Sequence, residues 1–232
     1  MIRKMYPLLS GGIDSTVATL KRMQQPDFIE LQPVFIDYGQ KACEQEWNSV
    51  RNISGELPRL AENRPIHFEN PRRIDLSSTP DRTERAFGWS KSQLIEGNIG
   101  NEPYLENRNM VLLSLASSYV ESQIKESEEG IIVTGFRDEF SDTKKEFVNL
   151  LNDLLVFLLK GTKKSIIVEA PAVGYGPWGK KRMLEDFRHF KEIIDLTWSC
   201  YEPNEGKPCL HCDACRDRKQ AFHEVFGTGH RQ

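Results

Sequence analysis

Short apolar runs alternate with longer amphipathic stretches along this chain, and the alternation predicts its architecture. Apolar runs that are rich in β-branched residues and bounded by polar turns are typical of buried parallel strands. Three clear runs and two weaker ones lie at 34–37, 130–135, 165–169, 8–9 and 66–68. Apolar residues recur with helical spacing in the stretches between them, at 14–24, 44–62, 108–125 and 144–160. Strands and helices in this order imply βαβ crossovers, and therefore an α/β fold with a parallel sheet covered on both faces.

Three segments depart from this alternation. Pro7 removes a backbone donor where the first strand should run, so we expect that strand to be short. The stretch 70–103 has no sustained periodicity and is too long for an ordinary connection, which favours a mobile lid or a contact with a partner. After Pro177 the pattern changes to short helices and a cysteine-bearing loop. The predicted division is a main domain over 1–176 and a C-terminal subdomain over 177–232.

Composition and charge narrow the class of protein. The chain has 232 residues, with 31 Lys and Arg against 34 Asp and Glu, giving a net charge of -3. This balance argues against direct nucleic-acid binding through a broad basic surface. The longest strongly apolar run, 150–159, has about half the length that a membrane span needs. The first residues lack the apolar stretch of a secretory signal. We therefore expect a soluble cytoplasmic enzyme.

The segment Ser10-Gly-Gly-Ile-Asp-Ser-Thr16 carries the first chemical signal. It follows an apolar run and opens the first predicted helix, where backbone N–H groups and the helix dipole attract an anion. Two glycines allow a phosphate to approach the backbone, and no Lys follows them, so this is not the common ATPase loop. The alternative is a glycine turn before a helix, in which the Ser, Asp and Thr side chains serve only as caps.

The second signal is a group of cysteines near the C-terminus. Cys209, Cys212 and Cys215 form two successive Cys-x-x-Cys steps, and Cys200 lies nine residues upstream. Four thiolates at this spacing can close a tetrahedron around Zn²⁺ and leave no position for water, so we predict a structural zinc site. His211 is a competing ligand, and a redox Cys-x-x-Cys pair is a further alternative. The remaining Cys43 is interpreted as a small buried side chain or a surface thiol.

The hexapeptide Ser-Gly-Gly-x-Asp-Ser resembles the signature of the PP-loop ATP pyrophosphatases. That family cleaves ATP between its α and β phosphates and adenylates a substrate oxygen, and its loop holds the departing pyrophosphate. The resemblance implies binding of ATP, with Mg²⁺ at Asp14, and catalytic roles for Ser10, Asp14 and Ser15. The nucleotide-binding residues that it implies are Leu9, Ser10, Gly11, Gly12, Asp14, Ser15, Thr16, Asp37, Tyr38 and Gly39.

Further segments, together with the loop and the cysteines, are similar to the 7-cyano-7-deazaguanine synthase (QueC) family over essentially the whole chain. These segments are 37–40, 107–109, 142–147, 169–171 and 197–201. The resemblance implies a Rossmann-like PP-loop fold with a five-stranded parallel sheet and a C-terminal zinc-binding helical subdomain. It also implies a homodimer that converts 7-carboxy-7-deazaguanine, ammonia and ATP into the nitrile. The reaction passes through an adenylated carboxylate and an amide, and releases AMP and pyrophosphate.

The substrate half of the resemblance is less complete than the nucleotide half. Arg108 at a helix start is assigned to catalysis and substrate binding, with a plain surface ion pair as its alternative. The other substrate-binding residues that the resemblance implies are Asn109, Gly135, Asp142 and Lys144. Asp142 is equally suited to cap a helix. Where the family usually has Gly-x-Asn and a longer segment ending in Asp-Cys-Arg, this chain has Gly135-Phe-Arg137 and then Asp142-Thr-Lys144.

This altered segment keeps two other functions open. One is a QueC-like enzyme of a phage-defence system, which adenylates a deazaguanine and attaches it to a protein or another acceptor. The other is an ATP-binding partner subunit that has lost turnover.

Overall fold

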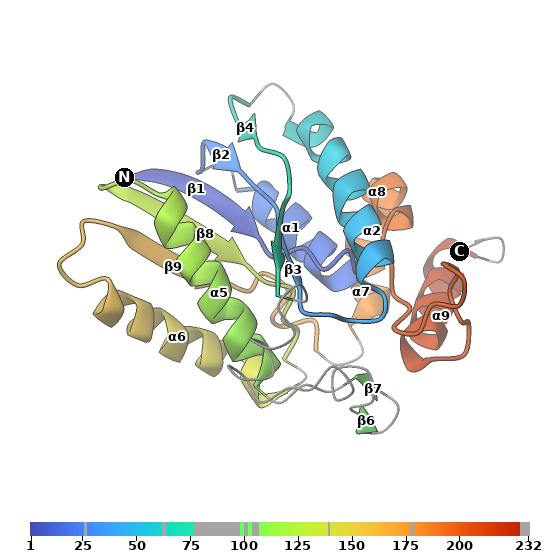
Figure 1. Ribbon diagram of the computed structural model, residues 1–232. Helices are drawn as coiled ribbons and strands as arrows, with labels where there is room; N and C mark the ends of the chain where they lie inside the picture. Colours follow the sequence, from blue (N-terminus) through green and yellow to red (C-terminus); the bar gives the residue numbers. More distant parts are fainter. Residues whose placement is uncertain are drawn as a thin grey trace.

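The sheet at the centre of the protein has five strands, and all of its paired strands are parallel. The computed structural model describes residues 1–25, 27–61, 64–76, 98–99, 102–103, 107–138, 140–176 and 179–227. In spatial order the strands are β4 (His67–Phe68), β2 (Glu30–Leu31), β1 (Ile2–Pro7), β8 (Glu128–Val133) and β9 (Ser165–Glu169). The chain thus starts in the middle of the sheet, fills one side and then the other (Figure 1). The predicted α/β fold is confirmed, and the strand order reverses between β1 and β8.

Two strands continue beyond this sheet after short interruptions. β3 (Val34–Asp37) follows β2 after residues 32–33, and β5 (Arg72–Asp75) follows β4 after residues 69–71. β3 and β5 pair with each other in parallel, and Leu8 forms a bridge to the start of β3. The interrupted strands therefore extend toward the carboxyl edge of β1, where polar loops gather.

The first strand was predicted at Leu8–Leu9 and was expected to be short, and both expectations were wrong. β1 has six residues, lies before that run and ends at Pro7. The N–H of Leu8 donates to β8 at 2.8 Å, and the N–H of Leu9 donates to β3 at 3.0 Å. Because successive N–H groups of a strand point to opposite neighbours, the nitrogen of Pro7 faces the same side as that of Leu9. That side is interrupted at residues 32–33, so the missing donor of Pro7 breaks no ladder at this point.

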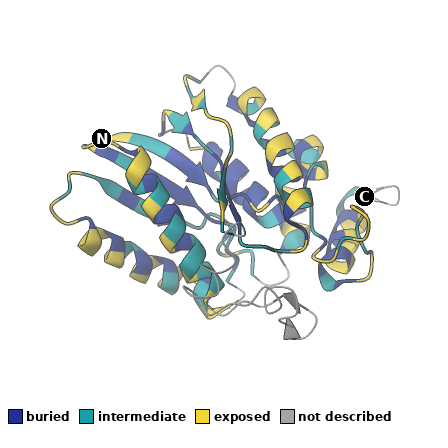
Figure 2. Cartoon of the chain, viewed as in Figure 1, coloured by how far each residue is buried: buried dark blue, intermediate teal, exposed yellow. Residues whose placement is uncertain are grey.

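Helices cover both faces of the sheet and form two separate cores. One core joins α1 (Ile13–Met23) and α2 (Cys43–Glu56) with C-terminal helices, and the other joins α5 (Arg108–Gln123) with α6 (Lys145–Leu158). Strand residues alternate between the cores: Met5 lies in the first and Tyr6 in the second. The sheet and α1 are largely buried, whereas the outer sides of α2 and α6 face solvent (Figure 2). The four helices predicted between the strands are thus confirmed.

The C-terminal part consists of short helices, as the sequence predicted. They are α7 (Lys180–Asp186), the 3-10 turn η3 (Arg188–Phe190), α8 (Lys191–Asp195) and α9 (Asp213–Phe226). The first core includes Met183, Ile194 and Phe222 from these helices, so they share one apolar core with α1 and α2. The division of the chain between residues 176 and 177 stays a prediction. Among the described helices, none has the length and apolarity that crossing a bilayer requires.

The stretch 70–103 contains more regular structure than its sequence indicated. Its first part forms β5, and an antiparallel pair, β6 (Asn98–Ile99) with β7 (Glu102–Pro103), lies at its other end. The prediction that this segment is part of a loop was wrong. β5 is an edge strand with one apolar residue, Ile74, among polar residues, so its sequence shows no apolar run. The remainder, 77–97, lies outside the described residues, and the predicted lid or partner contact falls there. Two 3-10 turns complete the elements, η1 (Leu57–Ala61) and η2 (Ser141–Thr143).

Candidate functional site

The loop between β1 and α1 lies at the carboxyl edge of the sheet, where the strand order reverses. Open α/β sheets bind ligands at such a point. Gly11 adopts φ +78°, and a Cβ at this residue would lie 2.7 Å from the carbonyl oxygen of Glu46. The carbonyl of Gly11 accepts a 2.7 Å hydrogen bond from the N–H of Trp198. The loop is thus fixed between α2 and the C-terminal segment by contacts that only glycine permits.

The hydroxyl groups of this loop organise the turn, and they do not cap the helix. Gly12 is the N-cap residue of α1, and no side chain in the described part of the chain caps that end. Ser15 and Thr16 instead donate to the carbonyl of Gly12, at 3.3 and 2.7 Å. Ser10 and Ser15 share a hydrogen bond of 3.1 Å between their Oγ atoms. The capping alternative is therefore wrong, and no described side chain takes up the first-turn N–H groups, which are the donors that an anion would use.

The loop that follows β8 packs directly on the start of α1. A Cβ at Gly135 would lie 2.6 Å from the backbone nitrogen of Ser15, so the two backbones touch. Two residues further on, the buried Arg137 places its Nε 3.1 Å from Oδ2 of Asp14. The other oxygen of that carboxylate, Oδ1, is buried and has no hydrogen-bond partner among the described residues. A buried acceptor without a partner is costly, which marks Asp14 as a position where a cation or a donor would be favoured.

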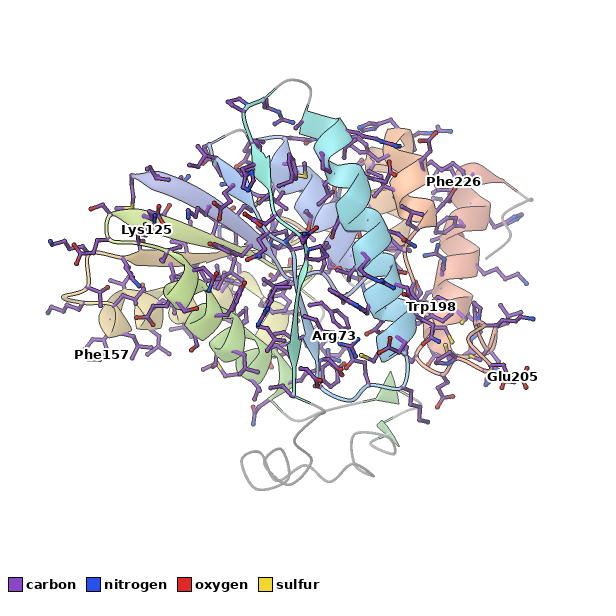
Figure 3. The ribbon with its side chains drawn as sticks, turned by 45° about the horizontal axis from the view of Figure 1, so that its top comes forward. Arg73, Lys125, Phe157, Trp198, Glu205 and Phe226 are labelled. Carbon is purple, nitrogen blue, oxygen red and sulfur yellow. The ribbon has the colours of Figure 1, made fainter. Side chains whose placement is uncertain are left out.

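The turn after β3 brings Asp37 into a polar cluster with the edge strand β5. Its carboxylate accepts 3.0 Å from the N–H of Gly39 and 2.7 Å from Nη2 of Arg73. Arg73 also reaches Glu44 at 2.8 Å and projects from β5 toward α2 (Figure 3). Burial by itself would raise the pKa of Asp37. The hydrogen bonds from Arg73, Gly39 and Cys43 outweigh burial, so the pKa lies below its usual value. Asp37 is thus an anchor for the turn.

Cys43 lies at the start of α2, buried in the first core beside Asp37. Burial and the nearby carboxylate raise the pKa of its thiol well above the ordinary value. The thiol therefore remains protonated at neutral pH, and it is the buried side chain that the sequence favoured.

Arg108, the first residue of α5, approaches the same turn from the opposite side. It forms a hydrogen bond with Tyr38 and lies near Tyr201 and Asp142. Burial by itself would lower the pKa of Arg108. These neighbours outweigh burial and raise the pKa above its usual value, so the guanidinium stays charged. Arg108 is therefore a half-buried member of a polar cluster that includes Tyr38.

Glu46 on α2 is a titratable group of this cluster that the sequence did not single out. Its Oε2 accepts 2.8 Å from Nε2 of Gln40, whose Oε1 accepts from the N–H of Tyr38 at 3.0 Å. Burial raises the pKa of Glu46 to about 7, although Gln40 and Arg108 act to lower it. A proton at this carboxyl group is thus exchanged near neutral pH.

Two of the predicted substrate-binding residues meet at the starts of α5 and α6. Nδ2 of Asn109 donates to Oδ2 of Asp142 at 2.9 Å, joining residues that are 33 positions apart. Asp142 lies in η2 and is not the N-cap of α6, which is the exposed Lys144. Asn109 occupies Oδ2 of Asp142, so Oδ1 is the oxygen that can accept a hydrogen bond from a ligand. Lys144 extends the site toward solvent.

The four predicted cysteines converge on one point. The Sγ atoms of Cys200, Cys209, Cys212 and Cys215 all lie within 4.8 Å of one another, and the cluster could hold a metal ion. The N–H of Cys212 points to the sulfur of Cys209 at 3.4 Å, and the N–H of Cys209 points to that of Cys200 at 3.2 Å. Burial raises the pKa of Cys209, but backbone N–H groups and neighbouring thiols bring it to about 6. His211 instead bonds to the carbonyl of Cys209, at 2.8 Å.

The cysteine segment also supports the loop between β1 and α1. Trp198, which lies between the first core and α9, donates its indole N–H to the carbonyl of Cys200 at 2.7 Å (Figure 3). Its backbone N–H holds the carbonyl of Gly11, as described above. Arg218 of α9 is buried and donates to Oγ1 of Thr197 at 2.6 Å. The cluster and the glycine loop are therefore connected through two consecutive residues, 197 and 198.

The structure brings most of the predicted residues to one edge of the sheet, from the loops after β1, β3 and β8 and from the starts of α5 and α6. The sequence analysis assigned no role to Gln40, Glu46, Arg73, Arg137, Trp198 and Tyr201. Four of them had a signal: Gln40, Trp198 and Tyr201 lie in segments similar to the QueC family, and Arg137 lies two residues after Gly135 in the altered segment. Glu46 and Arg73 had none, because their positions depend on contacts between distant segments.

A parallel α/β sheet with a Ser-Gly-Gly-Ile-Asp-Ser loop at its reversal point defines a PP-loop protein of the ATP pyrophosphatase type. The family described as "Queuosine biosynthesis protein QueC" matches residues 4–226. The chain belongs to this family.

Curated relatives cover nearly the full length. A 7-cyano-7-deazaguanine synthase from Methanobrevibacter smithii is 30% identical over 230 residues, covering 96% of this chain and 94% of its own. One from Leptospira interrogans is 29% identical over 227 residues, with 96% and 87% covered. The solved U34-tRNA thiolase NcsA from Methanococcus maripaludis aligns over 98% of this chain and 68% of its own. Its 13% identity and TM-score of 0.40 are too low to add to the assignment.

Proposed function

We propose that the protein converts 7-carboxy-7-deazaguanine and ammonia into 7-cyano-7-deazaguanine at the expense of ATP, releasing AMP and pyrophosphate. The observation that carries the proposal is the convergence at one sheet edge of the glycine loop, the Arg108 cluster and the Asn109–Asp142 pair. Membership of the QueC family and the names of the curated relatives support it. A homodimer and a cytoplasmic location remain expectations.

The glycine loop suits the departing pyrophosphate. Adenylation makes a carboxylate electrophilic by giving it AMP as a leaving group, so the enzyme must stabilise the charge that leaves with pyrophosphate. Outward N–H groups of α1 are preorganised donors for that charge. Gly11 and Gly135 let α2 and the loop after β8 pack against this loop and the start of α1, and Ser10 and Ser15 add hydroxyl donors. The unpartnered Oδ1 of Asp14 fits a Mg²⁺ ligand, and that ion would neutralise phosphate charge when bound.

The acceptor side of the site suits a flat base that carries N–H groups. Asp142 has one oxygen engaged by Asn109, and its other oxygen can accept from a guanine-type N–H group. Arg108 is charged and rigidly held by Tyr38, so it is placed to bind the substrate carboxylate or the α-phosphate. Positioning these two reactants is the main contribution that we assign to the side chains.

The cysteine cluster suits a structural Zn²⁺. Four zinc-bound thiolates lie about 2.3 Å from the metal and about 3.8 Å from one another. The four sulfur atoms here all lie within 4.8 Å of one another, which allows such a site. Four thiolates leave no position for water, so the metal stabilises the fold and takes no part in adenylation. Through Trp198 it would hold the glycine loop in place.

One observation favours a second candidate function. The segment from Gly135 to Lys144 departs from the family pattern, and it ends in an exposed Lys144 beside the Asn109–Asp142 pair. A site that is open on this side would admit a larger acceptor than ammonia. The second candidate is therefore adenylation of a deazaguanine followed by its transfer to a protein or another acceptor.

Mass spectrometry after incubation with 7-carboxy-7-deazaguanine, ATP and ammonium tests the proposal. We expect the nitrile, with two AMP formed for each nitrile, because a second ATP would activate the amide oxygen for dehydration as the first activates the carboxylate. Accumulation of the amide or a protein adduct would favour the second candidate. No consumption of the deazaguanine, in a protein that forms AMP, would refute both.

A further inference from the structure

Arg137 is a buried cation at the phosphate end of the site, and neither the sequence motif nor the proposed mechanism uses it. The loop that carries it packs on α1 through Gly135, and Asp138 anchors that loop by accepting 2.7 Å from the N–H of Gly174. Its position relative to the glycine loop is therefore fixed on both sides.

The pair that Arg137 forms with Asp14 is incomplete. Its Nε contacts Oδ2 at 3.1 Å, whereas Oδ1 of the same carboxylate is buried without a partner among the described residues. A guanidinium has five N–H donors in a planar fork and binds carboxylates and phosphates in two-point geometry. A half-buried carboxylate that is satisfied on one oxygen only is a weaker partner for this fork than a phosphate group with several charged oxygens.

We infer that Arg137 binds the phosphates of ATP and the departing pyrophosphate, and that its ion pair with Asp14 holds it in position until they bind. The inference rests on the proposed use of the glycine loop. The guanidinium of Arg137 contacts Asp14 in the first turn of α1, where backbone N–H groups would bind the same phosphates. On binding, Arg137 turns part of its fork from Asp14 to phosphate oxygens, and the carboxylate of Asp14 would then be available to hold a Mg²⁺ ion.

This arrangement has a consequence for the chemistry. Positive charge from a side chain is added where negative charge develops as pyrophosphate leaves, next to backbone donors that are already preorganised. The alternative is a purely structural pair, in which Arg137 does no more than neutralise the half-buried carboxylate of Asp14. The two roles differ in what happens when Asp14 carries no charge.

Calorimetric titration with inorganic pyrophosphate in the presence of Mg²⁺ measures the role of Arg137 without any deazaguanine, so the outcome is independent of the overall reaction. We expect Arg137→Asn to weaken binding about ten- to a hundredfold, and Arg137→Lys to weaken it less. Arg59→Asn, which removes an exposed charge paired with Glu56 far from the loop, is the matched control and should stay within about twofold. Binding by Arg137→Asn within about twofold of the parent, with an unchanged melting temperature, would overturn the inference.

A second comparison separates binding from neutralisation. In an Asp14→Asn background, titrated without Mg²⁺, the carboxylate that competes with phosphate for Arg137 is neutral, and we expect pyrophosphate to bind more tightly than to the parent. Adding Arg137→Asn should then weaken binding about tenfold or more. If the double variant instead binds pyrophosphate as well as Asp14→Asn alone, Arg137 has only a structural role.

Discussion

The two ends of the proposed site are built in different ways. The phosphate end consists of backbone: Gly11 and Gly135 let main chains touch, and the N-terminus of α1 presents its N–H groups. The acceptor end consists of side chains, in which Arg108 meets Tyr38 and Asn109 meets Asp142 across long sequence separations. A backbone site depends on a few glycines that nothing can replace, whereas a side-chain site can change its ligand by single substitutions. The altered segment of this chain lies mainly at the second kind of site.

The strongest test of the backbone end is Gly135→Ala. A methyl group at this residue would lie 2.6 Å from the nitrogen of Ser15, so the loop and α1 must move apart. We expect ATP binding to fall by more than about a hundredfold, with a loss of stability of about 2 kcal/mol or more. Calorimetry and thermal unfolding measure both effects.

Gly55→Ala is the matched control, because a Cβ at this residue of α2 meets nothing within 4 Å. It should leave ATP binding unchanged and add about 0.5–1 kcal/mol of stability. An unchanged ATP affinity in Gly135→Ala would contradict the close backbone approach.

Removal of the metal should act on the phosphate end rather than on the acceptor end. Cys212→Ala is expected to lose most of its zinc, to destabilise the fold and to weaken ATP binding about tenfold or more, because Trp198 then no longer fixes Gly11. Metal analysis and ATP titration measure these changes. Cys43→Ser, which leaves the cluster intact, should keep about one equivalent of zinc. Full zinc retention in Cys212→Ala would refute the site.

The acceptor end is tested by Asp142→Ala. The change removes the partner of Asn109 and leaves donors on the bound base unpaired, at a cost of about 1–3 kcal/mol. Deazaguanine affinity should fall about ten- to a hundredfold while ATP affinity stays within about twofold. Lys144→Ala, at the exposed rim, should change either affinity much less. Equal losses of both ligands in Asp142→Ala would mean that the two ends are not separate.

Glu46 predicts a smaller effect, on the dependence of stability on pH. Its pKa in the fold is about 7, above the ordinary 4.5, so the folded state favours the protonated form. The stability from this group is complete below pH 4.5 and is lost as the pH rises through 7. Asp37, Tyr38 and Arg108 are the charged or titratable groups around it.

The stability of Glu46→Gln relative to the parent should therefore rise by about 1–2 kcal/mol when the pH is raised from 5.5 to 8.5. Denaturant unfolding at the two pH values measures this gain. A difference between variant and parent that does not change with pH would show that Glu46 is not held in its protonated form.

The contrast between the two ends also explains what the sequence predicts well. The glycine loop and the cysteine cluster are local motifs, so the residues that form them are close in sequence and their spacing reveals them. The parallel sheet follows from apolar runs such as 165–169, whose bounds the structure reproduces. β2 was missed because it has only two residues, and β5 because polar side chains cover an edge strand.

The side-chain cluster could not be predicted in the same way. Arg73 and Asp37 are joined by the pairing of β3 with β5, and this pairing depends on where both strands are interrupted. Arg137 contacts Asp14 only because Gly135 lets β8 approach α1. Contacts of this kind depend on how the elements pack, which periodicity along the chain does not describe.

Oxygen labelling tests the central claim, adenylation of a carboxylate at the glycine loop, most directly. The protein is incubated with 7-carboxy-7-deazaguanine labelled with ¹⁸O in both carboxylate oxygens, together with ATP and ammonium, and AMP is analysed by mass spectrometry. If the carboxylate attacks the α-phosphate, the bridging oxygen leaves with AMP, so each AMP should carry one ¹⁸O and the pyrophosphate none. Unlabelled AMP, or formation of ADP and phosphate in its place, would contradict the account.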